Sequence, residues 1–136
     1  MSIQNLIKFG ERKSSEIFSE IAKQAAEEIK SNANVNKSTQ LRKFYDELAM
    51  WNERVQLAQA DKLAKFNELE PFIKMLKAKV AYAKGRKHID DKFMAVFNQT
   101  IDEIKCPQTL KEAKLFMEAV MGYCKYYEEK LNKERK

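Results

Sequence analysis

The segment STQLRKFYDELAMWNERVQLA, residues 38–58, decides the fold class of this 136-residue chain. Its large apolar and aromatic side chains recur every three or four residues, at Leu41, Phe44, Tyr45, Leu48, Trp51 and Val55. This spacing places them on one face of an α-helix. Ser38 is a favourable N-cap residue. We therefore predict a helix from Ser38 to about Ala58 that buries this face.

The same periodicity occurs in other parts of the chain. Further helices are expected over residues 14–30, 71–85, 91–104 and from 109 towards the C-terminus, and no segment is a convincing strand. Residues 1–13 are expected to add a frayed extra turn. With only 3 Gly and 2 Pro, the composition is that of a helix-rich globular protein. The sequence thus predicts an all-α protein, a compact bundle of about five helices in one domain spanning residues 1–136.

Local signals predict the ends of the third and fourth helices. Pro71 is tolerated in a first turn, and Gly85 suits the position after a last turn. Asp90 or Asp91 is expected to cap the next helix. The predicted core stripe of the third helix consists of Leu69, Phe72, Ile73, Leu76, Val80 and Ala83.

Positive charge is concentrated in one part of the chain. The net charge is +6, from 26 Lys+Arg and 20 Asp+Glu. No acidic residue occurs between Glu70 and Asp90, and this gap holds Lys74, Lys77, Lys79, Lys84, Arg86 and Lys87. The rest of the chain is therefore electrically balanced. A concentrated basic patch indicates a polyanionic partner.

The predicted third helix arranges these basic residues on two flanks. At about 100° per residue, Lys74, Lys77 and Lys84 share one side, among alanines. Lys79 and Arg86 lie on the other side of the core stripe. Lysines supply point charges for phosphates, and an arginine can bind one through two hydrogen bonds. We therefore expect contacts to a nucleic-acid backbone.

The alternative is a solvated lysine face without a ligand. Elsewhere the chain supplies partners within a helix, because Arg42 with Asp46 and Lys43 with Glu47 form i,i+4 pairs. The basic segment has no such acids between its lysines, which favours polyanion binding. Tyr82 is the only nearby aromatic residue expected outside the core, so recognition of phosphates rather than bases is predicted.

Groups for catalysis or metal binding are scarce in the sequence. His88 is the only histidine, and no common catalytic motif is present, so a non-enzyme without cofactor or metal is predicted. Cys106 and Cys124 stand alone, which indicates neither a disulfide nor a zinc site. No apolar run approaches the roughly 20 residues of a membrane span. The cytoplasm is the expected location.

The last predicted helix has two apolar stripes, and Thr109 with Glu112 is expected to form its capping box. The first stripe consists of Leu110, Ala113, Met117, Val120, Met121, Cys124 and Leu131. Phe116, Tyr123 and Tyr126 mark the second. This helix is central in the bundle, or the second stripe binds another subunit, and the two explanations can hold together. The second reading predicts a homodimer of the isolated chain or a contact made only in a complex.

Two blocks carry a resemblance to a known family. STQLRKFYDEL (38–48) and PFIKMLKAKVAYAKGR (71–86) resemble the signature blocks of the small subunit of the type III-A CRISPR effector, the Csm complex. The segment FMEAVMGYCKYY (116–127) is similar in character to the end of that family. The resemblance covers residues 38–127 in blocks.

The resemblance implies a compact all-helical, non-catalytic subunit. Several copies would form a minor filament along the inner side of the complex, beside other Csm subunits including the large subunit. Their basic residues would contact guide RNA and target RNA. The RNA-binding candidates in the matching blocks are Arg42, Lys43, Lys74, Lys77, Lys79, Lys84 and Arg86.

Three other hypotheses remain at this point. A helical protein-interaction module would use its last helix and carry the lysines for solubility only. A small ribonuclease would depend on His88. The small subunit of the sister type III-B complex is also helical, although the paired blocks favour type III-A.

Overall fold

The computed structural model describes residues 2–134, and all regular elements in that range are helical. The α-helices are α1 (Ala22–Ile29), α2 (Ser38–Gln56), α3 (Lys62–Lys74), α4 (Leu76–Gly85), α5 (Asp91–Asp102) and α6 (Pro107–Glu134). Two 3₁₀ turns (Ile3–Leu6 and Gly10–Arg12) and a π-helical turn (Ile17–Ile21) precede α1. The predicted all-α bundle is confirmed. Residues 1, 135 and 136, the outermost parts of the predicted domain, lie outside the described residues.

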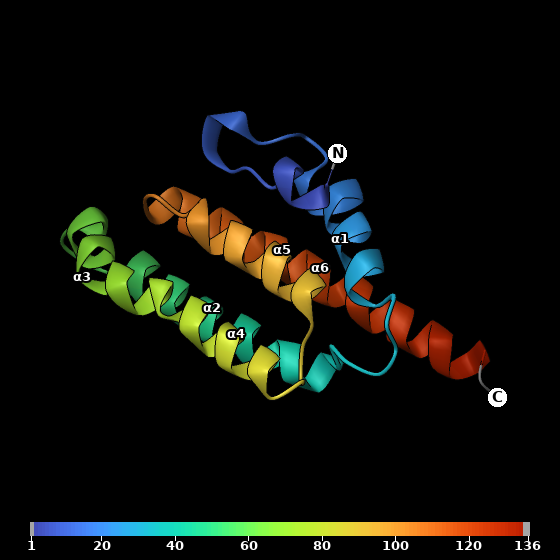
Figure 1. The fold of residues 1–136 in the computed structure, drawn as a ribbon. Coiled ribbons are helices and arrows are strands. Elements are labelled where there is room, and N and C mark those ends of the chain that lie inside the picture. The colour runs from blue at the N-terminus through green and yellow to red at the C-terminus, as the bar shows by residue number, and fades with distance from the viewer. Residues whose placement is uncertain (1, 135–136) are drawn as a thin grey trace.

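Helix α6 organises the bundle. It runs along the molecule and packs against both α1 and α2, while α4 packs against α5 and α2 (Figure 1). Phe44, Phe93 and Phe97 form an aromatic cluster in the core, with ring centroids 5.6–5.8 Å apart. The buried apolar side chains of all these helices belong to one cluster. Burial of such side chains stabilises the fold by about 1.5–3 kcal/mol each.

The N-terminal segment differs from the expected frayed turn. Ile7 and Phe9 are buried, and the Phe9 ring packs on Phe116 with centroids 5.9 Å apart. The Gly10 N–H donates to Glu112 Oε1 at 2.7 Å. The prediction failed because this segment has too few residues to show a helical period, and its partners lie about 100 positions away.

The predicted third helix starts earlier and is divided. Asp61 caps α3, since its carboxylate accepts a hydrogen bond from the Ala64 N–H at 3.1 Å. Pro71 therefore lies inside α3 and not in a first turn, so the predicted start of this helix is wrong. Met75 joins α3 to α4 with helical backbone angles, φ −63° and ψ −19°. The expected core stripe holds except at Phe72, which is half exposed.

The end of α4 and the start of α5 show one wrong and one correct prediction. Gly85 is the last residue of α4, and the left-handed residue is Lys87, with φ 65°. The Asp90 carboxylate caps α5 by accepting from the Lys92 and Phe93 N–H groups at 3.1 and 3.2 Å. Asp90 is therefore the N-cap, which leaves Asp91 free for another contact.

The predicted capping box of the last helix is wrong. Helix α6 begins at Pro107, so Thr109 lies within its first turn, where its hydroxyl accepts from the Cys106 N–H at 3.0 Å. Glu112 accepts from Gly10 instead, at 2.7 Å. Burial alone raises the pKa of Glu112, but hydrogen bonds from Gln108 and Gly10 lower it below its ordinary value.

Ser38 does not cap α2 with its own side chain. Its N–H donates to Glu128 Oε2 at 3.0 Å, and its hydroxyl donates to the same oxygen. Lys30 Nζ, which is buried, donates to that carboxylate at 3.0 Å. Burial by itself raises the pKa of Glu128, but the hydrogen bonds from Ser38 and Lys30 lower it to about 2. A carboxylate from α6 thus holds the start of α2.

Candidate nucleic-acid interface

The stretch from Lys74 to Arg86, here called the basic segment, presents three exposed strips. Its buried side consists of Leu76, Val80 and Ala83. On the flank towards α5 lie Lys77 and Lys84, and on the flank towards α2 lie Lys79 and Arg86. Between the flanks runs a ridge of small exposed residues, Ala78, Ala81 and Gly85. The ion pairs of Lys77 and Lys84 with α5 and of Lys79 with α2 agree with the predicted flanks. Lys74, predicted on the side of Lys77 and Lys84, pairs instead with Glu70 of α3.

Acidic residues from other helices pair with these lysines. Lys77 Nζ lies 2.7 Å from Asp102 Oδ1, and Lys84 Nζ lies 2.8 Å from Asp91 Oδ1. Both lysine side chains remain 40% exposed. The absence of acids within the segment therefore does not mean absence of partners, because α5 supplies them.

Two more lysines of the segment are paired. Lys79 Nζ lies 2.8 Å from Glu47 Oε1 on α2, and Lys74 Nζ lies 3.7 Å from Glu70 Oε2. Exposed pairs of this kind contribute about 0–1 kcal/mol to stability. A phosphate group could replace such a carboxylate at little cost to the fold. The pairs therefore hold the ammonium groups in defined positions and contribute little to the stability of the fold.

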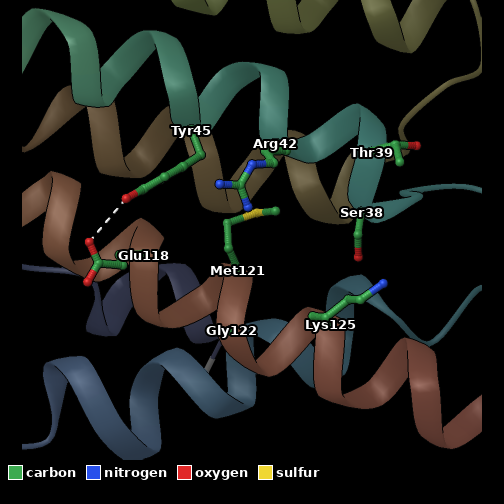
Figure 2. A pocket seen from close by; sticks show the side chains of 8 residues that line it. All are labelled: Ser38, Thr39, Arg42, Tyr45, Glu118, Met121, Gly122 and Lys125. Atoms are coloured by element: carbon green, nitrogen blue, oxygen red, sulfur yellow. Dashed lines mark hydrogen bonds between the residues drawn. The ribbon is translucent and has the colours of Figure 1, made fainter.

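Arg42 and Lys43 lie on different sides of α2. Arg42 Nε is 3.7 Å from Asp46 Oδ1, as predicted, whereas Lys43 Nζ donates to Gln40 Oε1 at 3.4 Å rather than to Glu47. Arg42 points into an open groove of about 440 Å³ between α2 and α6 (Figure 2). The lining of this groove consists of Ser38, Thr39, Arg42, Tyr45, Glu118, Met121, Gly122 and Lys125.

Figure 2 shows how the charges are distributed in the groove. Tyr45 Oη donates to Glu118 Oε1 at 3.1 Å at one end, and Arg42 and Lys125 extend from opposite walls. Lys114 also donates to Glu118, at 2.6 Å, and its hydrogen bond lowers the pKa of that carboxyl. The groove thus brings together charges of both signs from α2 and α6, and its cations Arg42 and Lys125 pair with Asp46 and Glu129 on their own helices.

An aromatic surface beside the basic segment was only partly predicted, because Tyr82 was expected outside the core and Phe72 inside it. Phe72 is 51% exposed and stacks on Trp51, with ring centroids 5.6 Å apart and an interplanar angle of 21°. Tyr82 is 67% exposed. We call this surface the aromatic flank, and its members are Trp51, Arg54, Phe72, Met75, Lys79, Tyr82 and Arg86. Phe72 lies at the edge of the predicted core stripe. This edge position was the feature of the sequence that could have indicated an exposed side chain.

Comparison with known families identifies the chain. The family model described as Csm2 Type III-A matches residues 12–130. The chain belongs to this family. Neither the curated proteins nor the solved structures yield a match. The match confirms the resemblance seen in the two sequence blocks and decides for type III-A over type III-B.

Membership of the Csm2 family defines the general role of the chain. It is the small subunit of the type III-A Csm complex and a structural component of that complex. It therefore associates with other Csm subunits.

The three predicted interface residues are placed differently in this Csm2 family member. Phe116 is fully buried in the core, so its side chain is not available at the surface. Tyr126 is exposed and Tyr123 half-buried. Both tyrosines line an open groove of about 730 Å³ between α6 and the α1 region, together with Phe18 and Lys23. This groove is the part of the second stripe that a partner subunit could reach.

The remaining reactive groups show no assembled site in the described chain. His88 is exposed, and its backbone carbonyl accepts from the Asn36 N–H at 3.1 Å. Within residues 2–134, no group of three or more His, Cys, Asp or Glu could hold a metal ion. Cys106 and Cys124 are free thiols, and burial raises the pKa of Cys124 to about 12. No described helix is both long and apolar enough to cross a membrane.

Proposed function

We propose that this chain is a non-catalytic, RNA-binding small subunit of a type III-A Csm interference complex. Copies of it form the minor filament along the inner side of the complex and stabilise the assembly of guide RNA and target RNA. The observation that carries this proposal is the acid-free run from residue 71 to residue 89, whose cations lie at the surface of the end of α3, of α4 and of the turn that follows α4.

Phosphate binding by this segment has a simple physical basis. Lys77 and Lys84 each lie beside an exposed carboxylate, at 2.7 and 2.8 Å, and a phosphate can take the place of that carboxylate. Arg86 adds a guanidinium that can bind a phosphate through two hydrogen bonds. The alanine and glycine ridge between the flanks allows a sugar-phosphate chain to approach the helix backbone. Contacts of this kind hold RNA without reading its sequence.

The proposed partners follow from the same assignment. They are guide RNA and target RNA, the large subunit and other Csm subunits, and further copies of this chain. Tyr123 and Tyr126 are the proposed residues for subunit contacts, including a homodimer of the isolated chain. The cytoplasm, where guide and target RNA would meet, is the proposed location.

Charge reversal of the basic segment tests RNA binding. We compare the wild type with the Lys74/Lys77/Lys84→Glu variant by fluorescence anisotropy on single-stranded RNA across a salt series. The wild type is expected to bind without sequence preference and to weaken steeply with salt. Each lost phosphate contact reduces the slope of log K against log salt by about 0.7, so the triple variant should lose about 2.

A control variant separates local from global charge effects. Lys62/Lys105/Lys111→Glu changes the net charge by the same amount at exposed positions elsewhere. It should keep most of the affinity and slope. A Lys74/Lys77/Lys84→Gln variant guards against repulsion between new glutamates and Asp102 or Asp91. If the Glu and the Gln variants of Lys74, Lys77 and Lys84 are both folded and both keep the wild-type RNA affinity, the basic segment is rejected as the binding surface.

A second candidate function is a protein-interaction module without direct RNA contact. The observations that favour it are the carboxylate partners of the lysines and the tyrosine-lined groove at α6. In that case Tyr123→Ala or Tyr126→Ala would release the chain from the Csm complex, and charge reversal in the basic segment would have little effect on assembly.

A further inference from the structure

The aromatic flank is the most exposed apolar surface beside the basic segment. Phe72, Met75 and Tyr82 are each more than half exposed, at 51%, 55% and 67%. Met75, Lys79, Tyr82 and Arg86 lie on one stripe because they are spaced by four, three and four residues. Leaving such side chains in water has a cost that a ligand could remove.

We propose that the aromatic flank binds unpaired RNA bases by stacking them on the rings of Phe72 and Tyr82. This inference rests on the proposed RNA-binding function and extends it, because the sequence predicted contacts to phosphates alone. The ligand is single-stranded RNA, or a base displaced from a duplex, without preference for one base.

Phe72 is a preorganised platform. Its ring lies nearly parallel to that of Trp51, at 21° and with centroids 5.6 Å apart. Trp51 is held in turn by Arg54, whose Cζ is 5.0 Å from the Trp51 ring centroid, and by Glu47, which accepts from the Trp51 Nε1–H at 3.3 Å. A base on the open part of the Phe72 ring would continue this stack. Little side-chain entropy would be lost, because the ring is already held.

Tyr82 provides a second platform combined with a cation. The Arg86 Cζ is 5.8 Å from the Tyr82 ring centroid, and Arg86 Nη1 donates to Tyr82 Oη at 3.2 Å. Aromatic rings and guanidinium planes are the groups on which single-stranded bases stack. Phe72 and Tyr82 are ten positions apart, or about 15 Å along a helix. They would therefore hold two bases that are not neighbours in the RNA.

The charges around the flank favour RNA over a protein partner. Protein interfaces are enriched in arginine and aromatic residues but depleted in lysine, so the groups that favour RNA are Lys79 at the border of this surface and Lys77 and Lys84 across the alanine ridge. The acidic group in contact with the flank, Glu47, is paired with Lys79 at 2.8 Å. An RNA strand could thus place its phosphates on the lysines while its bases face the aromatic rings.

The test compares two ligands that share a backbone and differ only in their bases. We measure binding of the full-length chain to a labelled oligouridine and to an abasic oligomer of the same length, by anisotropy. Stacking on one platform is worth about 1–3 kcal/mol, so the wild type should bind oligouridine about 5- to 150-fold more tightly than the abasic ligand.

Variants then assign this difference to the flank. Phe72→Leu and Tyr82→Leu keep an apolar side chain and remove the ring, so each should reduce the preference for bases and leave the salt slope unchanged. Leu63→Ala is the control, since Leu63 is similarly exposed at 53% but lies in the first turn of α3, outside both the aromatic flank and the tyrosine-lined groove. It should leave the preference intact. Circular dichroism confirms that each variant is folded.

The possible results separate this inference from the proposed function. If the wild type binds both ligands equally, phosphate binding stands and base stacking is rejected. If it binds neither, the proposed function fails and this inference fails with it. If Phe72→Leu keeps the base preference but releases the chain from another Csm subunit, the flank is a protein contact and the stacking assignment is wrong.

Discussion

The Lys30–Glu128 and Lys77–Asp102 pairs have similar N–O distances, 3.0 and 2.7 Å, but very different surroundings. The Lys30 side chain is 4% exposed and that of Lys77 40%. The first pair also includes Ser38 and the Asn36 carbonyl, which accepts from Lys30 Nζ at 2.8 Å. Distance alone therefore does not show which pair maintains the fold. Burial shows it: the buried Lys30 pair maintains the fold, whereas the exposed lysines such as Lys77 remain accessible at the surface.

The strongest test of this comparison removes the buried lysine. Lys30→Met should lower the free energy of unfolding by about 3 kcal/mol, because Glu128 and the Asn36 carbonyl lose their buried donor. Lys77→Met is the matched control on the exposed pair and should cost less than about 1 kcal/mol. Urea unfolding measures both. Equal losses would contradict the role given to burial.

The pH dependence of stability isolates Glu128. Its pKa falls from an ordinary 4.5 to about 2 in the folded protein. A lowered pKa contributes stability above the unfolded value, here about 3 kcal/mol, and this is lost as pH falls from about 4.5 towards 2. Glu128→Gln should therefore be much less stable than wild type at pH 7. The gap should nearly close at about pH 2, as followed by thermal unfolding across pH.

Two neighbouring carboxylates give the finest test. Asp90 caps α5 and accepts from Asn36 Nδ2 at 2.7 Å, whereas Asp91 is 79% exposed and pairs with Lys84. Asp90→Ala should cost about 1–2 kcal/mol, and Asp91→Ala about 0.5 kcal/mol or less. Urea unfolding compares them.

The Asp91→Ala variant also tests the proposed RNA surface. Asp91→Ala removes the partner of Lys84 and should raise RNA affinity severalfold in anisotropy. A loss of RNA affinity in that variant would argue against Lys84 as a phosphate contact.

The sequence was sufficient wherever the deciding information was local. The stripe from Leu41 to Val55 predicted α2, and Asp90 was correctly among the two predicted caps of α5. The family resemblance lay in two short blocks, and the match over residues 12–130 confirms it. Periodicity and short motifs are contained within a single helix, so they can be recognised before the fold is known.

The sequence failed where the deciding partner lies in another element. Glu128 binds Ser38 from 90 positions away and Glu112 binds Gly10 from 102 positions away, so neither contact has a local signal. The carboxylates facing Lys77 and Lys84 come from α5 or its start in the same way. Phe72 was misplaced because a residue at the edge of a stripe is buried or exposed according to the neighbouring helix, here α2 with Trp51.

The position of α6 also has a consequence during synthesis on the ribosome. The N-terminal segment and α1 complete their packing on α6, which is made after all the other described helices. Since a chain is made from its N-terminus at about 5–20 residues per second, the faces of α1 and α2 that pack on α6 stay uncovered until α6 has been made. A product truncated before α6 is therefore expected to leave these faces of α1 and α2 exposed to water.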